Sequence, residues 1–130
     1  MTKSRRPARP KLPPVSEQMK AWSSALVSEI SDWPDVDARS FFGFTALYRQ
    51  ERIFAALPRT RSINAADSFA FKLEKASPQL RARLDDDRRV GSMQMNRSQW
   101  FTFELDSGRD LHDALDWLVE AYEAARNPKK

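Results

Sequence analysis

Apolar residues recur every three or four positions near the start of the chain, and this spacing predicts an amphipathic helix. The stripe consists of Met19, Trp22, Leu26, Ile30 and Trp33. These residues would share one side of an α-helix of about 17 residues. Ser16 is a suitable N-cap, and Pro34 ends the helix because the residue before a proline avoids the α region.

The pattern then changes to an alternation of apolar and polar residues, which is typical of strands with one buried face. It predicts strands over residues 36–42, 44–49, 52–57, 69–73 and 97–105, and a loop over 59–66. Gln50-Glu51 predicts a hairpin turn, although no Asn-Gly or glycine supports it. In the last strand, Phe101 and Phe103 alternate with Trp100, so we expect Trp100 on the opposite sheet face beside Thr102 and Phe54.

Two further helices are predicted in the second half. Ser77-Pro78 begins a short helix through Leu84, because proline is well suited to the first helical position. A final helix of about 17 residues follows Gly108. Its predicted inner face is Leu111, Leu115, Leu118, Val119 and Tyr122.

Together these elements predict an α+β fold, with an antiparallel β-sheet packed against N- and C-terminal amphipathic helices. The inward positions of the two long helices and the two clearest strands predict the core. They are Trp22, Leu26, Ile30, Phe71, Phe101, Phe103, Leu115 and Leu118.

The amino end has a different composition. Residues 1–14 hold five Lys or Arg, no acid and four prolines, which opposes both helix and strand. We expect a disordered basic tail over 1–14, a single domain over 15–126 and a disordered tail over 127–130. No apolar segment follows the early charges as in a secretory signal, and none approaches the roughly 18 residues of a membrane span. A soluble, cytoplasmic protein without a membrane partner is therefore expected.

Composition narrows the possible chemistry. The 130 residues include no cysteine and one histidine, His112, which argues against thiol chemistry and a multi-histidine metal centre. His112 and Asp116 are spaced as a surface pair on a helix, and Asp85–Asp87 resembles a solvated loop more than a cation site. Lys72 is either a desolvated base or a lysine whose ammonium reaches water. The residues do not point to an enzyme, a cofactor or a metal.

Charge is distributed unevenly. Residues 15–38 carry a net −4, residues 39–97 a net +6, and residues 98–125 a net −6, within a total of +4. The basic segment and the tail form a candidate nucleic-acid interface. Its candidate residues are Arg49, Arg52, Arg59, Arg61, Arg88 and Arg89. The alternative is that these arginines occupy exposed strand positions and pair with nearby acids.

Several short motifs resemble the TfoX amino-terminal domain and its MmcQ/YjbR-like relatives. The motifs are Phe42-Gly43, Ala46-Leu47-Tyr48, Ile53-Phe54-Ala55, Phe71-Lys72-Leu73 and residues 116–122, DWLVEAY. Phe44 replaces the second glycine of the family pattern, and the turn at 50–52 lacks glycine. The chain is also similar, more weakly, to small "luciferase family" domains at residues 32–36 and 100–103, without their usual histidines. The resemblance implies an antiparallel α+β fold and a regulatory or DNA-binding role in bacteria, with no established catalytic residue.

Two functions therefore compete. The first is a non-enzymatic regulatory or binding module that contacts nucleic acid, or an acidic protein, through the basic strand-loop face and the N-terminal tail. The second is a protein–protein interaction module that forms a homodimer or binds another protein through apolar residues on the second face of the sheet.

Overall fold

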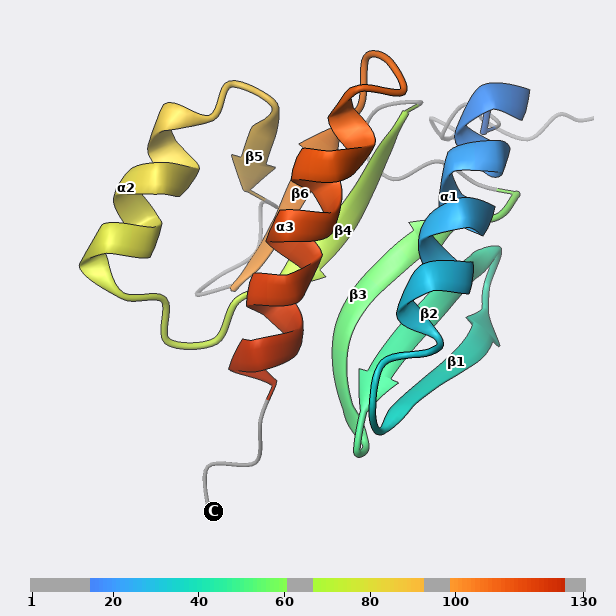
Figure 1. Ribbon diagram of the computed structural model, residues 1–130, viewed down its shortest axis with the longest axis horizontal. Coiled ribbons are helices and arrows are strands. Elements are labelled where there is room, and N and C mark those ends of the chain that lie inside the picture. The colour runs from blue at the N-terminus through green and yellow to red at the C-terminus, as the bar shows by residue number, and fades with distance from the viewer. Residues whose placement is uncertain (1–14, 61–66, 93–98, 126–130) are drawn as a thin grey trace, which may run out of the picture.

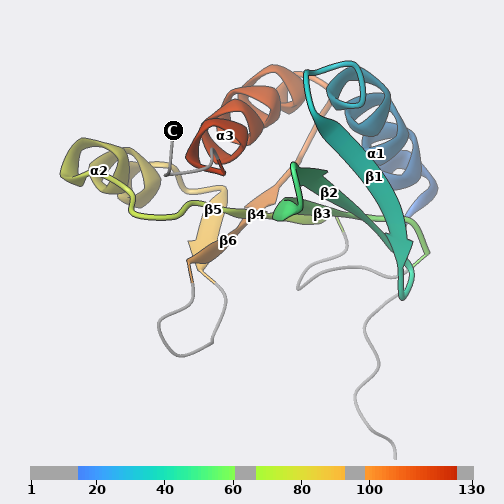
Figure 2. The ribbon, with the colours of Figure 1, turned by 90° about the horizontal axis from the view of Figure 1, so that it is seen from below.

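The chain folds into a six-stranded antiparallel sheet that carries its long helices on one face, so the predicted α+β class is confirmed (Figures 1 and 2). The computed structural model describes residues 15–60, 67–92 and 99–125. Its elements are α1 (Glu17–Ile30), β1 (Val36–Phe41), β2 (Phe44–Arg49), β3 (Arg52–Pro58), β4 (Ser68–Lys72), α2 (Pro78–Asp86), β5 (Val90–Ser92), β6 (Trp100–Glu104) and α3 (Asp110–Ala124). The two predicted tails and Arg61 lie outside the described residues.

The strand order is β1-β2-β3-β4-β6-β5, so β1 and β5 are the edges of the sheet. Figure 2 shows α1 and α3 side by side on one face, with no described helix on the other. Among the described residues, no helix is long and apolar enough to cross a membrane.

Helix α1 begins as predicted and ends earlier than predicted. The Ser16 hydroxyl accepts a hydrogen bond from the Met19 amide at 3.0 Å and donates one to Asp67 at 2.7 Å. The helix ends at Ile30, and residues 31–35 form turns instead of a further helical turn. Trp33 therefore lies beside the helix stripe and packs edge-on against Tyr122, at 5.1 Å between ring centres.

Two tight turns connect the first three strands. Phe42 and Gly43 have φ values of 49° and 86°, and Gln50 and Glu51 have φ values of 49° and 74°. Positive φ at both central residues is the geometry of a type I′ turn, which matches the twist of paired strands. The predicted hairpin at Gln50-Glu51 is confirmed without glycine. The carbonyl and carboxylate of Asp35 stabilise it by accepting from the Gln50 backbone amide and side chain, each at 3.2 Å.

A β-bulge in β3 moves Phe54 to the face of the sheet opposite to the predicted one. Leu47 pairs with Ala55, but the next residue, Tyr48, pairs with Ile53, so Phe54 is an extra residue in β3. Phe54 is fully buried in the core, 5.7 Å from the Tyr122 ring. The prediction that it lies beside Trp100 is wrong because the bulge interrupts strict alternation.

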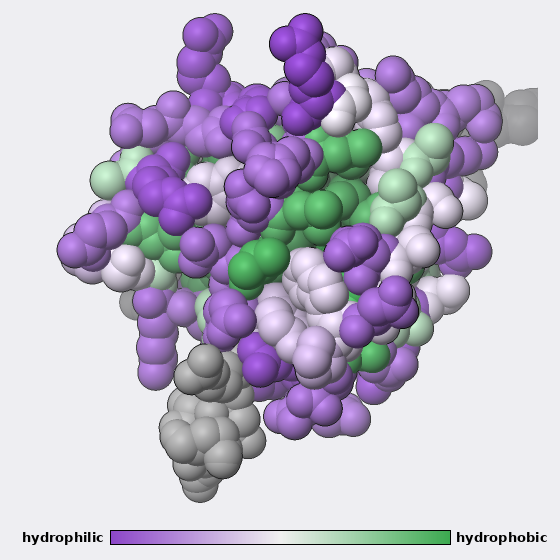
Figure 3. Space-filling model, viewed as in Figure 1, coloured by the Kyte–Doolittle hydropathy of each residue, from purple (hydrophilic) through white to green (hydrophobic). Residues whose placement is uncertain are grey.

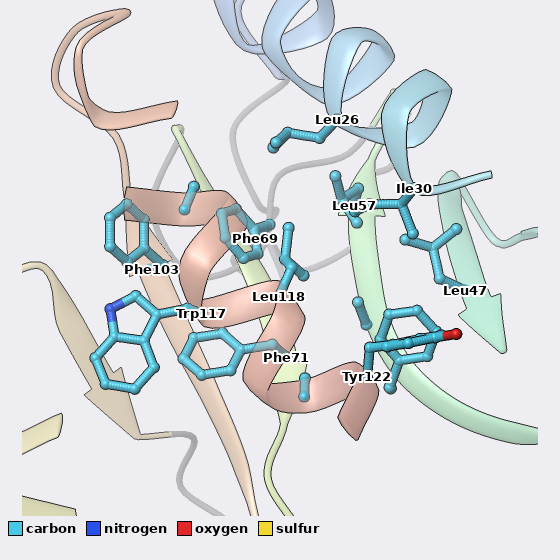
Figure 4. Close-up of a cluster of buried hydrophobic side chains, with 14 of the residues drawn as sticks. Leu26, Ile30, Leu47, Leu57, Phe69, Phe71, Phe103, Trp117, Leu118 and Tyr122 are labelled. Atoms are coloured by element: carbon cyan, nitrogen blue, oxygen red, sulfur yellow. The ribbon is translucent and has the colours of Figure 1, made fainter. Parts of the chain in front are cut away.

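The core lies between the sheet and its two long helices (Figure 4). Six predicted core residues are buried as expected, namely Trp22, Leu26, Ile30, Phe71, Phe103 and Leu118. Phe101 and Leu115 are only partly buried against this cluster.

The inner face of α3 is rotated from the predicted one. Its buried residues are Ala114, Trp117, Leu118, Ala121 and Tyr122, whereas Val119 is 40% exposed. Stacking of Trp117 on Phe71, with ring centres 5.8 Å apart, favours this rotation because an aromatic ring buries more area than an aliphatic side chain. Figure 3 shows apolar side chains on the helix-bearing side of the molecule, surrounded by polar ones.

Candidate interaction surface

The predicted nucleic-acid residues are spread across the described sheet. Arg49 and Arg52 flank the β2–β3 turn, and Arg59 follows the opposite end of β3. Arg88 and Arg89 connect α2 to β5, at the other edge of the sheet. The fold therefore does not gather these residues into one patch.

Two of these arginines hold the fold together. The Arg49 guanidinium donates to the Tyr122 backbone carbonyl at 2.9 Å and lies 4.1 Å from the centre of the Tyr122 ring. Arg52 forms an ion pair with Glu74. The same carboxylate forms a second ion pair with the Lys72 ammonium, at 3.4 Å. Arg52 therefore pairs with a nearby acid, as in the alternative to a nucleic-acid interface that the sequence left open.

Arg89 lies among three carboxylates beside a depression of about 1060 Å³ between α2, α3 and the end of β6. Its guanidinium contacts Asp87 at 2.9 Å, Asp110 at 2.8 Å and Asp113 at 3.1 Å. The hydrogen bond to Asp87 is the main cause that raises the pKa of Arg89 above its usual range. Arg89 thus ties the start of β5 to the first turn of α3.

Two of the carboxylates around Arg89, those of Asp87 and Asp110, are stabilised in their charged form. Burial alone would raise the pKa of Asp87, but hydrogen bonds from Arg89 and Trp117 outweigh it and lower that pKa. The Asp106 backbone amide is the main cause that lowers the pKa of Asp110, with further contributions from the Ser107 amide and Arg89.

Arg59 and Arg88 are exposed to solvent. Arg59 donates to the Ser40 hydroxyl at 2.8 Å, and Arg88 has no ion pair among the described residues. Nucleic-acid binding by these two side chains stays a prediction.

The other candidate residues, His112 and the acidic run 85–87, do not form a separate site among the described residues. His112 forms the expected exposed pair with Asp116, at 3.8 Å. Together with Asp113 these groups lie close enough to surround a cation, but Asp113 already contacts Arg89 and His112 is 84% exposed. The predicted loop at residues 85–87 is wrong for Asp85 and Asp86, because α2 continues to Asp86, whereas Asp87 follows the helix and contacts Arg89.

The most exposed apolar feature that the structure describes is the tip of the first hairpin. Phe41 is 52% exposed and Phe42 is 80% exposed, with ring centres 4.7 Å apart. Every residue from Asp37 to Phe41 is exposed, and among the described residues no strand lies on the outer side of β1. Sequence analysis missed this surface because the order of strands in a sheet is not encoded locally.

The pairing of β1 with β2 determines which β1 residues direct their backbone N–H and C=O groups away from the sheet. In an antiparallel ladder, alternate residues direct both backbone groups toward the neighbouring strand, and the others direct them away. The Asp35 carbonyl accepts the Gln50 amide at 3.2 Å, and the register continues evenly to Phe41 opposite Phe44. The outward backbone groups therefore belong to Val36, Ala38 and Ser40.

The β1 side chains carry opposite charges on one face. Ala38 lies opposite the buried Leu47, so its side chain is on the helix-bearing side, and Asp37 and Arg39 are on the helix-free face. Arg39 donates to Asp37 at 2.8 Å and lies 4.3 Å from the centre of the Tyr48 ring. That hydrogen bond is the main cause that raises the pKa of Arg39.

A row of small side chains crosses the middle of the helix-free face. Ala46, Ala56 and Ala70 lie level with one another across three strands, and Thr102 continues the row. Trp100 pairs with Lys72 and is partly buried. As predicted, Trp100 and Thr102 lie on the face opposite Phe103, whose side chain is in the core.

No protein-family profile, curated protein or solved structure matches this chain.

Proposed function

We propose that the chain is a non-enzymatic protein-interaction module that binds through the β1 edge, defined as the outward backbone of residues 36–40 together with Phe41 and Phe42. The observation that carries the proposal is a six-residue edge strand whose last residue, Phe41, is exposed together with Phe42 in the following turn. Unpaired edge amides accept an added strand, and exposed aromatic side chains provide apolar area for a partner.

The absence of edge protection in β1 supports this role. Sheet edges are usually protected by short strands, prolines, bulges or unpaired charges. At the opposite edge, β5 has only three residues. β1 has six residues without a proline, its register with β2 is regular, and its Asp37 and Arg39 neutralise each other.

The test introduces a proline at Ala38. Its amide points away from β2, so Ala38→Pro removes a docking donor while the β1–β2 ladder keeps its own hydrogen bonds. Ala38→Ser keeps the amide and is the matched control. Each variant carries a photo-reactive amino acid in place of Phe42 and is irradiated both alone and in extract of the source cells.

We expect a discrete crosslinked product with the Ala38→Ser variant and its loss with Ala38→Pro. The same label at the exposed Arg81 of α2 reports crosslinks unrelated to β1. A product that survives the proline, or no product under either condition, would overturn the proposal.

Nucleic-acid binding is a second candidate, favoured by the tail rather than by the sheet. Residues 1–14 carry five cations and no acid, which suits contact with phosphates in any sequence. The resemblance to TfoX-type domains supports a bacterial regulatory role, and such a role is compatible with either partner. A cytoplasmic location is part of this proposal.

A further inference from the structure

The β1 edge is complementary to itself. We propose that it binds a second copy of this chain, with the two β1 strands antiparallel about a two-fold axis at Ala38, so that two six-stranded sheets become one. This inference rests on the proposed function and specifies the partner.

The direction of the backbone groups in β1 restricts the registers in which two copies of this strand can pair. Outward residues must lie opposite outward residues, so Val36, Ala38 and Ser40 of one copy pair with the same set in the other. An axis at Ala38 places Ala38 opposite Ala38, and Val36 opposite Ser40. These pairs provide about six main-chain hydrogen bonds, more than a register centred nearer either end of the strand.

The charges select the same register. With the axis at Ala38, Asp37 of each copy lies opposite Arg39 of the other on the helix-free face. These are non-hydrogen-bonded pairs, in which side chains approach most closely. A shift that centres the axis on Asp37 places two aspartates opposite each other, and an axis on Arg39 does the same with two arginines, so both neighbouring registers are repulsive.

This register also provides a partner for the exposed aromatic tip. Phe41 and Phe42 of one copy come to the end of the strand pair where the turn of residues 31–35 precedes β1 of the other copy, because the two strands run in opposite directions from Ala38. Pro34 is exposed, and its ring offers an apolar surface at each end of the strand pair. The paired segment spans only about 17 Å, so we expect a concentration-dependent dimer rather than a permanent one.

Cysteine crosslinking tests the axis directly, because the chain has no native cysteine. The two Ala38 Cα atoms would lie about 5.5 Å apart, within the range of a disulfide. The two Ser40 Cα atoms would be displaced by four residues, or about 13 Å, which is too far. Under mild oxidation, Ala38→Cys should form a covalent dimer and Ser40→Cys should not, although both residues are exposed and share one side of β1.

A charge exchange tests the ion pairs. Asp37→Arg places two arginines opposite each other in its own dimer, and Arg39→Asp does the same with two aspartates. Sedimentation should show that each variant alone is monomeric at concentrations where the natural chain dimerises. An equimolar mixture should regain the dimer mass, since every facing pair is again of opposite charge.

Three results would overturn the inference: equal crosslinking by both cysteine variants, no crosslinking by Ala38→Cys, or dimers of Asp37→Arg alone as strong as the natural ones. A chain that stays monomeric at all concentrations, yet forms a proline-sensitive crosslink to a different protein in extract, refutes the second copy while the proposed function stands. Absence of any proline-sensitive crosslink refutes both.

Discussion

Replacing Arg89 with glutamine should destabilise the fold far more than the same change at its neighbour Arg88. Arg89 contacts three carboxylates and lies 4.9 Å from the centre of the Phe103 ring. Glutamine keeps a polar side chain but removes the charge, so Asp87, Asp110 and Asp113 would face one another without a cation.

The burial of these groups sets the magnitude. The exposed side-chain fraction is 32% for Arg89, 15% for Asp87 and 16% for Asp110, which places the cluster between a surface pair and a buried one. A surface ion pair contributes about 0–1 kcal/mol, and breaking a buried one costs about 3–5 kcal/mol. We expect Arg89→Gln to lower the free energy of unfolding by about 2 kcal/mol at neutral pH.

The loss should depend on pH with a definite sign. The pKa values of Asp87 and Asp110 are lowered in the folded state. The stabilising contribution of these two aspartates is therefore complete above their pKa in the unfolded state, about 4. It is lost as the pH falls through their lower pKa values in the folded state. The difference between Arg89→Gln and the natural chain should shrink as the carboxylates become protonated.

Urea unfolding followed by tryptophan fluorescence measures both quantities, since Trp117 donates to Asp87 at 3.2 Å and reports on this cluster. Arg88→Gln is the matched control, because the exposed Arg88 has no ion pair in the part of the chain that the structure describes. It should change stability by less than about 0.5 kcal/mol. Equal losses for the two variants, or a loss at Arg89 that does not change with acid, would refute the role assigned to Arg89.

Three further predictions concern the core, a long-range hydrogen bond and the tail. Phe103 is fully buried and stacked on Phe69 at 5.6 Å, so Phe103→Ala should cost about 3–5 kcal/mol in denaturant unfolding, and a loss below about 1 kcal/mol would contradict its inward face. The buried Tyr122 hydroxyl donates to the Pro34 carbonyl at 2.8 Å, so Tyr122→Phe should cost about 1 kcal/mol in the same assay, and no change would mean that water replaces this bond. If the tail binds duplex DNA, deletion of residues 1–14 should flatten the log–log salt dependence of affinity by about 0.9 for each phosphate that the tail neutralises, and its five cations can neutralise at most five; an unchanged slope would exclude the tail.

Local patterns predicted most of the elements because each depends on neighbouring residues. The Ser16 cap and the 3.6-residue stripe place α1 correctly, and Ser77-Pro78 begins α2 as predicted. Strand β5 was missed because three residues, Val90–Ser92, are too few to show an alternation. Its Val90 is held by pairing with Phe103, a long-range contact that no local pattern contains.

The errors arise where packing overrides periodicity. The extra residue in β3 moves Phe54 to the core face, and nothing in Ile53-Phe54-Ala55 marks the bulge. In α3 the predicted aliphatic stripe is displaced by Trp117, whose ring packs on Phe71, 46 residues earlier in the chain. Both outcomes depend on which aromatic rings meet across the sheet.

The candidate site shows the same division between local pattern and topology. Six arginines in a basic segment predicted a nucleic-acid face, but their roles depend on what lies next to each in the fold. Arg49 and Arg89 bind to α3 and Arg52 binds Glu74, so three of the charges counted in the sequence are engaged within the fold. The self-complementary segment Asp37-Ala38-Arg39 is visible in the sequence. It can pair with a second copy only because β1 is an edge strand and the Ala38 backbone groups point outward. In a central strand the same three residues would have a neighbour on each side and could not bind a second copy. Strand order, which is set by long-range pairing, therefore decides which charges stabilise this fold and which are available to a partner.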